Sequence, residues 1–128
     1  MAEEMVQLKY VMPEQVNQKK SVNLARTEIM SAQVQVVAEG GENNLHSHTG
    51  TDGFWFVLSG SARFYSSDDD LFAEIHKYEG VLVPKGVAYW FESSGSELLE
   101  ILHVGARTQS IADQRVDLRE QKREVGNF

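Results

Sequence analysis

The chain has 128 residues, 41% of them hydrophobic, which is enough to bury the core of one globular domain. Its 12 lysines and arginines are outnumbered by 19 aspartates and glutamates, and the net charge of −7 disfavours nucleic acid and anionic membrane as partners. It contains no cysteine, which excludes a disulfide framework, a thiolate metal site and a cysteine nucleophile.

The ends of the chain carry no sign of export or membrane insertion. Residues 1–9 lack the basic start and apolar core of a secretory signal, and no window is long and apolar enough for a membrane span. We therefore expect a soluble, cytoplasmic protein. We further expect an N-terminal arm over 1–20, one β-domain over 21–105 and a polar tail over 106–128, which either wraps the surface, adds an edge strand or is disordered.

Short strands separated by turn signals are predicted from residue 21 onward. Residues 21–39 predict two strands, or one long bent strand, because polar and apolar side chains alternate cleanly over 33–36. Further strands are expected over 54–58, 61–65, 71–77, 81–83, 87–92 and 98–104. About eight short strands with a turn roughly every ten residues predict an antiparallel β-barrel or sandwich.

Two histidines stand at the start of the hairpin that contains residues 54–58. His46 and His48 are separated by one residue, so in a strand both rings point to the same face and can share one partner. Neutral imidazole is a common ligand of Zn, Fe, Ni, Cu and Mn. The pair therefore predicts half of a transition-metal site. The alternative is two imidazoles whose hydrogen bonds are satisfied by backbone or solvent.

The wider pattern resembles the two motifs of the cupin superfamily. The residues that carry the resemblance are Gly40, His46-Ser47-His48, the apolar strand ending at Gly60 and the turn Pro84-Lys85-Gly86. The resemblance spans residues 34–104 and implies an all-β jelly-roll barrel. It also implies a metal inside the barrel, usually held by two histidines and a glutamate of the first motif and a histidine of the second.

The chain departs from that pattern at two of the four ligand positions. Gly53 stands where the glutamate is expected, with Asp52 one residue earlier. Strand alternation points Asp52 to the opposite face unless the hairpin bulges. Tyr89 stands at the position of the histidine of the second motif.

A third imidazole is available on the last predicted strand. His103 shares the parity of Leu99 and Ile101, so it faces the barrel interior if Glu100 faces water. The resemblance thus implies a divalent transition metal (Fe, Mn, Ni or Zn) with the following candidate ligands: His46, His48, His103, Asp52 and Tyr89.

Parity also predicts which side chains surround such a site. Trp55 and Val57 share the parity of residue 53, and Phe91 follows Tyr89, so all three are expected to line a pocket with the tyrosine. Tyr89 itself either contacts the substrate, as a proton donor or hydrogen-bond partner, or only fills core volume.

The opposite face of the strand over 54–58 predicts a partner. Phe54, Phe56 and Leu58 point away from the barrel centre, and three large apolar side chains are not expected to stay in water. Small cupins are often dimers in which a strand of one subunit joins the sheet of the other, so the resemblance implies a homodimer. The alternative is that the N-terminal segment or the tail covers these side chains within one subunit.

Two functions follow from these expectations. The first is a metal-dependent cupin enzyme that acts on a small organic molecule by a dioxygenase-like or isomerase-like reaction, with His46 and His48 as ligands and Tyr89 facing the substrate. The second is a metal-free or vestigial barrel that binds a small ligand without turnover. The missing glutamate and second-motif histidine favour the second.

Overall fold

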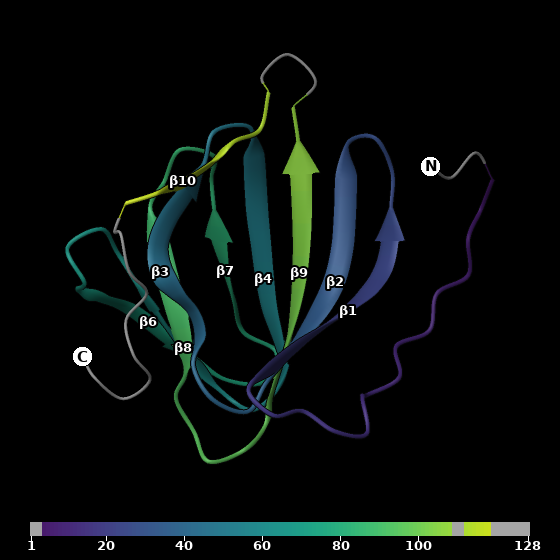
Figure 1. Cartoon of the computed structure of the whole chain (residues 1–128), viewed down its shortest axis with the longest axis horizontal. Helices are drawn as coiled ribbons and strands as arrows, with labels where there is room; N and C mark the ends of the chain where they lie inside the picture. Colours follow the sequence, from purple (N-terminus) through teal and green to yellow (C-terminus); the bar gives the residue numbers. More distant parts are fainter. Residues whose placement is uncertain (1–3, 109–111, 119–128) are drawn as a thin grey trace.

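A computed structural model describes residues 4–108 and 112–118. The remaining residues of the predicted arm and tail, 1–3, 109–111 and 119–128, lie outside the described residues. Within the described part the backbone forms ten strands (Figure 1). They are β1 (Lys19–Arg26), β2 (Met30–Val37), β3 (Gly41–His48), β4 (Thr51–Ser59), β5 (Ala62–Tyr65), β6 (Leu71–Ile75), β7 (Gly80–Val83), β8 (Tyr89–Ser93), β9 (Leu99–Arg107) and β10 (Arg115–Asp117).

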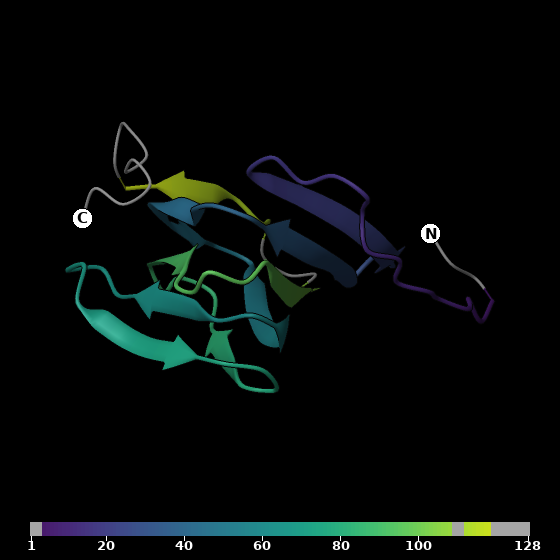
Figure 2. The same ribbon diagram turned by 90° about the horizontal axis from the view of Figure 1, so that it is seen from below.

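The strands form two five-stranded antiparallel sheets (Figures 1 and 2). The first sheet has the order β1-β2-β9-β4-β7, and the second has the order β10-β3-β8-β5-β6. Buried apolar side chains of both sheets meet in one core: Val37, Trp55, Val57, Ala62, Phe64, Ile75, Val83, Tyr89, Phe91, Leu99 and Ile101. The all-β antiparallel fold class predicted from the sequence is confirmed. None of the described segments is a helix with the length and apolarity that a membrane crossing needs.

Most differences from the expected strands lie at strand ends. Residues 21–39 form two strands, and β9 continues past Val104 to Arg107. In the tail, Arg115–Asp117 adds an edge strand to the second sheet, pairing Arg115 with His48 and Asp117 with His46. The tail thus supports the strand that carries the histidine pair.

The described part of the N-terminal arm runs along the β1 side of the molecule (Figure 2). Its Tyr10 hydroxyl donates a hydrogen bond of 2.6 Å to Glu100 Oε1 on β9. The described part of the arm leaves Phe54, on the outer face of β4, 44% exposed.

Glycine is required where β4 ends. Gly60 has a φ of 83°, in the left-handed region that favours glycine, and a Cβ at this position would lie 2.7 Å from the carbonyl oxygen of Leu98. The glycine predicted to close the first motif therefore has a steric reason in this fold.

Candidate functional site

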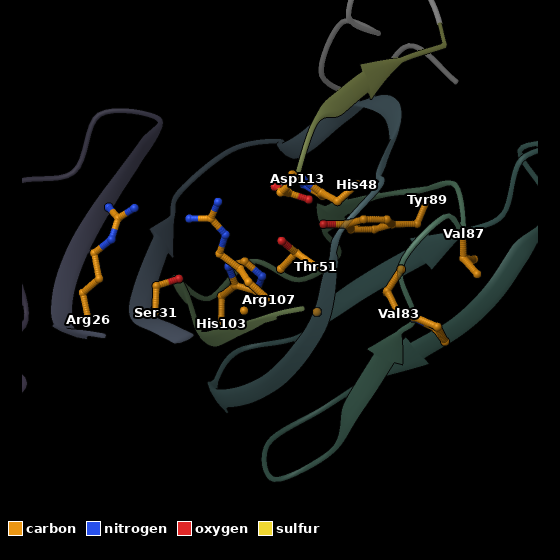
Figure 3. Close-up of a pocket in the computed structure, with 13 residues that line it drawn as sticks. Arg26, Ser31, His48, Thr51, Val83, Val87, Tyr89, His103, Arg107 and Asp113 are labelled. Atoms are coloured by element: carbon orange, nitrogen blue, oxygen red, sulfur yellow. Dashed lines mark ion pairs between the residues drawn. The ribbon is translucent and has the colours of Figure 1, made fainter. Parts of the chain in front are cut away.

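A cavity lies over a row of residues that crosses all five strands of the first sheet. Backbone pairing aligns Arg26 with Ser31, Ser31 with Gly105, Gly105 with Gly53, and Gly53 with Val83. Paired residues on antiparallel strands direct their side chains to the same face. Because the two central members of the row have no side chain, a cavity of about 270 Å³ is left above them (Figure 3).

The wall of the cavity combines polar and apolar groups. The polar side chains on it are Arg26, Ser31, His48, Thr51, Tyr89, His103, Arg107 and Asp113, and the apolar ones are Val83, Pro84 and Val87. Figure 3 shows the Tyr89 hydroxyl directed toward the middle of this group. Tyr89 comes from β8 in the second sheet, so the cavity lies between the two sheets.

The next row of the first sheet forms the floor of the cavity. His103 pairs with Gln33 on one side and with Trp55 on the other. Its ring stacks on the indole of Trp55, with centroids 3.9 Å apart and planes at 15°. The Gln33 amide nitrogen lies 3.4 Å from His103 Nδ1; an amide N–H can only donate, so Nδ1 accepts and a neutral ring carries its proton on Nε2.

His46 and His48 come together with Tyr89, as their positions in the sequence predict. The ring of His46 lies 5.3 Å from that of His48 and 4.6 Å from that of Tyr89. His46 is fully buried, and its Nδ1 donates a hydrogen bond of 2.7 Å to the carbonyl oxygen of Asn44. This bond fixes the tautomer of a neutral ring, with the lone pair on Nε2.

His48 lines the cavity beside a carboxylate from the tail. Its Nδ1 lies 3.5 Å from Asp113 Oδ2, and Asp113 Oδ1 accepts a hydrogen bond of 3.0 Å from the Gly50 amide. Burial acts to raise the pKa of Asp113, but hydrogen bonds from Gly50 and the Thr51 side chain, together with His48, hold that pKa below its ordinary value. The carboxylate is therefore ionised at neutral pH. The β7–β8 turn also holds this histidine, because the Gly86 amide donates to the His48 carbonyl oxygen at 2.7 Å.

Residues 33–105, more than half of the chain, match the model of the cupin domain family. This chain is a cupin. The resemblance to cupins predicted from the sequence motifs is thereby confirmed, and the fold is the jelly roll that the family implies. A comparison with curated proteins gives no match.

Solved structures similar to this cupin share its fold at low sequence identity. One is a Klebsiella pneumoniae protein with a double-stranded β-helix domain, 18% identical, with a TM-score of 0.69 over 87% of this chain and 92% of the other. An RmlC-like cupin protein of Desulfovibrio desulfuricans is 16% identical, with a TM-score of 0.63 over 77% and 94%. A variant of Streptomyces PAC13 with uridine is 12% identical, with a TM-score of 0.63 over 82% of each chain.

Asp52 lies away from the histidine pair. Its side chain is exposed, and its Oδ1 accepts a hydrogen bond of 2.8 Å from the Lys85 amide in the β7–β8 turn. The physical reason is strand alternation: Gly53 faces the cavity, so its neighbour faces the opposite side. The structure gives Asp52 a part in holding this turn.

The three residues expected beside Tyr89 lie deeper than the cavity wall. Trp55, Val57 and Phe91 face the barrel interior, as parity predicts, but they are at most 1% exposed and belong to the closed apolar core. Trp55 contacts the ring of Phe91 at a centroid distance of 4.8 Å, and it stacks on the ring of His103. Their bulk fills the barrel beneath the cavity.

In the described part of this cupin, the donor set does not fit a metal centre of three or more protein ligands. His46 and His48 are close together, but His103 is stacked on Trp55 and Asp52 faces outward. Among residues 4–108 and 112–118, no three histidine, aspartate or glutamate side chains are arranged to hold a metal ion. At the position of the family's glutamate, a Cβ on Gly53 would contact Trp55 Nε1 at 3.4 Å and His103 Nε2 at 3.6 Å.

Several wall residues were not predicted from the sequence. Arg107 shares the parity of His103, so alternation could have placed it on the same face had β9 been expected to continue that far. Arg26 and Ser31 are brought in by the pairing of β1 with β2. Asp113 lies in the tail, and no local signal indicates which strand the tail joins.

Proposed function

We propose that this cupin binds a small organic molecule in the cavity between its sheets, without a metal centre of three protein ligands. The observation that carries the proposal is the pair Gly53 and Gly105 at the middle of the sheet, which leaves a hollow bordered by polar side chains from both sheets. Such a hollow is the usual form of a small-molecule site, and about 270 Å³ is close to the lower end of the common range.

The metal-dependent alternative has weaker support. It needs a third protein ligand beside His46 and His48. Of the two candidates predicted from the sequence, His103 stacks on Trp55, and Asp52 accepts a hydrogen bond from the Lys85 amide. Elemental analysis of protein purified without chelators tests it. We expect Fe, Mn, Ni and Zn well below stoichiometric amounts. A stoichiometric metal that is lost in the His46→Ala/His48→Ala double variant would contradict the proposal.

A second candidate function is acid–base catalysis on the bound molecule. It is favoured by His48, whose Nδ1 faces the ionised Asp113 carboxylate, and by the Tyr89 phenol on the same wall. An imidazole oriented by a carboxylate and a nearby phenol are groups that donate and accept protons in enzymes. A proton-transfer reaction such as an isomerisation fits this set.

The binding proposal is tested by filling the hollow. In a fragment screen followed by NMR, ligands of the wild-type protein should be lost in Gly53→Val, because the new side chain enters the cavity. A Cβ at residue 53 meets its neighbours at ordinary contact distances, so the fold should tolerate the change. The matched control is Ala106→Val, since Ala106 is exposed and faces the other side of the same sheet. Equal binding by both variants would contradict a site above Gly53.

We also propose that a second copy of the chain covers the outer face of β4 and β7. Phe54 and Leu82 are cross-strand neighbours there and are 44% and 65% exposed, and Phe56 stacks beside Phe54 with centroids 6.0 Å apart. An exposed apolar group of this kind is typical of an interface. Because the chain carries a net charge of −7, two copies repel each other less when they meet through this apolar group than through the acidic parts of the surface.

A further inference from the structure

Two arginines approach the cavity from one side. Arg26 ends β1 and Arg107 ends β9, and both line the cavity. Figure 3 shows the two guanidinium groups rising on the same side of the site, beside Ser31 and above His103. Within the described ranges neither arginine forms an ion pair with a carboxylate. Two cations directed at one space repel each other, and an anion between them removes that repulsion.

The β-ladder fixes the positions of these two side chains. Arg26 belongs to the same cross-strand row as Ser31 and Gly105, and Arg107 follows Gly105 by two residues, so it points to the same face. Arg107 also pairs with Thr51 on β4. Backbone pairing thus places both arginines on the cavity face of the first sheet.

The opposite end of the cavity is apolar. Val83 ends the row that Arg26 begins, and Pro84 and Val87 follow it in the β7–β8 turn. Figure 3 shows Val83 and Val87 across the site from Arg26. An occupant that reaches both ends therefore meets cations at one end and hydrocarbon at the other.

The charges on the described wall indicate how much negative charge the occupant carries. Arg26 and Arg107 supply two positive charges, and Asp113, beside His48, supplies the one negative charge. With neutral histidines the wall has a surplus of one positive charge, although the whole chain is strongly acidic. A singly charged anion balances this wall.

We infer that the occupant is a small monocarboxylic acid, with its carboxylate between Arg26 and Arg107 and its hydrocarbon end directed toward the apolar side of the cavity at Val83 and Val87. The inference rests on the proposed binding function and names its ligand class. The planar guanidinium fork matches a carboxylate in two hydrogen bonds, and Ser31 lies in the same row to donate a third. The cavity has the volume of roughly nine water molecules, which suits a short or branched acid.

Isothermal titration of the full chain with sodium isovalerate at constant ionic strength tests this inference. We expect saturable binding that is weakened about tenfold or more in Arg26→Gln and in Arg107→Gln, since each variant removes a charged hydrogen-bond donor. Arg26→Lys should be intermediate, because it keeps the charge and loses the fork. Arg63→Gln is the matched control, since Arg63 pairs with Glu74 at 2.8 Å on the second sheet.

Comparison probes separate failure of this inference from failure of the binding function. If isovaleramide binds as well as isovalerate and the arginine variants do not affect it, the acid assignment is overturned while the cavity remains a binding site. Preference for inorganic phosphate or succinate overturns the monocarboxylate class. If the acid and amide do not bind, and the fragment screen finds no ligand that Gly53→Val displaces, the binding function itself fails. Thermal unfolding of each variant establishes that it is folded.

Discussion

The imidazole of His103 lies flat against the indole of Trp55, with ring centroids 3.9 Å apart. The two side chains come from neighbouring strands, β9 and β4, and together form the floor of the cavity. This contact and the hydrogen bond with Gln33 fix the position of the third imidazole, and among the described residues it forms no group of three metal-ligating side chains with His46 and His48. In this cupin, the histidine on the last strand serves the packing of the barrel.

Replacing His103 should therefore cost stability. We expect His103→Ala to lower the free energy of unfolding by about 1–2 kcal/mol, because it removes a stacked ring pair and enlarges the cavity. Urea denaturation at pH 7 measures the difference. His76→Ala is the control: the His76 side chain is 62% exposed, and its replacement should change little. Equal effects of the two variants would contradict a structural role for the His103–Trp55 contact.

The Asp113 carboxylate should contribute stability only where it is ionised. Its pKa in the folded state lies below the ordinary aspartate value of 3.8. The contribution is therefore fully present above pH 3.8 and is lost as the pH falls through the lower folded-state pKa. We expect Asp113→Asn to be less stable than wild type by roughly 0.5–1 kcal/mol at pH 7, and the gap to close in acid.

Urea denaturation at several pH values between 7 and 2.5 measures this gap. Asp68→Asn, in the exposed turn before β6, is the control and should show no such pH dependence. A gap that widens toward acid would rule out a stabilising Asp113 carboxylate.

Gly53→Glu should give the cavity a metal site. The variant adds a carboxylate at the position of the family's glutamate ligand, on the face that borders the cavity with His48, and a Cβ at this position meets no atom closer than 3.4 Å. Three convergent ligands bind divalent transition metals much more tightly than two. Titration with Zn²⁺ or Mn²⁺ should show binding at least tenfold tighter than in wild type. Gly53→Gln has the same shape without the charge and should bind less; a variant no better than wild type would count against this geometry.

The proposed dimer is tested through its central aromatic side chain. Phe54→Glu places a charge on the outer face of β4, so we expect wild type to sediment as a dimer and the variant as a monomer. Phe72→Glu is the control, because Phe72 is 69% exposed on β6 of the other sheet. Sedimentation of wild type as a monomer would refute the proposal.

Alternation along single strands predicted a large part of the fold and of the site. It predicts that His46 and His48 lie side by side, that Trp55 and Val57 face inward and that Phe54 faces outward, and the structure has all of these. The resemblance added Tyr89, which meets His46 from the neighbouring strand. These predictions use only the alternation of side chains between the two faces of a strand. That alternation does not depend on how the strands are arranged in the sheet.

The cross-strand row could not be predicted in the same way. Arg26, Gly53 and Gly105 lie far apart in sequence, and they become neighbours only through the registers of β1, β2, β9 and β4. The motif pattern marks Gly53 only as a missing ligand, whereas its larger effect is to open space. Asp113 reaches His48 because the tail joins β3, and that pairing has no signature in composition or spacing.

The two glycines also set how the cavity responds to the length of whatever enters it. Side chains yield by changing rotamer, but the middle of this sheet presents only main-chain atoms, which the ladder of β4 and β9 holds in place. In a series of ligands that grow by one carbon at a time, binding should therefore stop abruptly at a certain length. Shorter members fit the cavity, and the first one that is too long meets the polypeptide backbone.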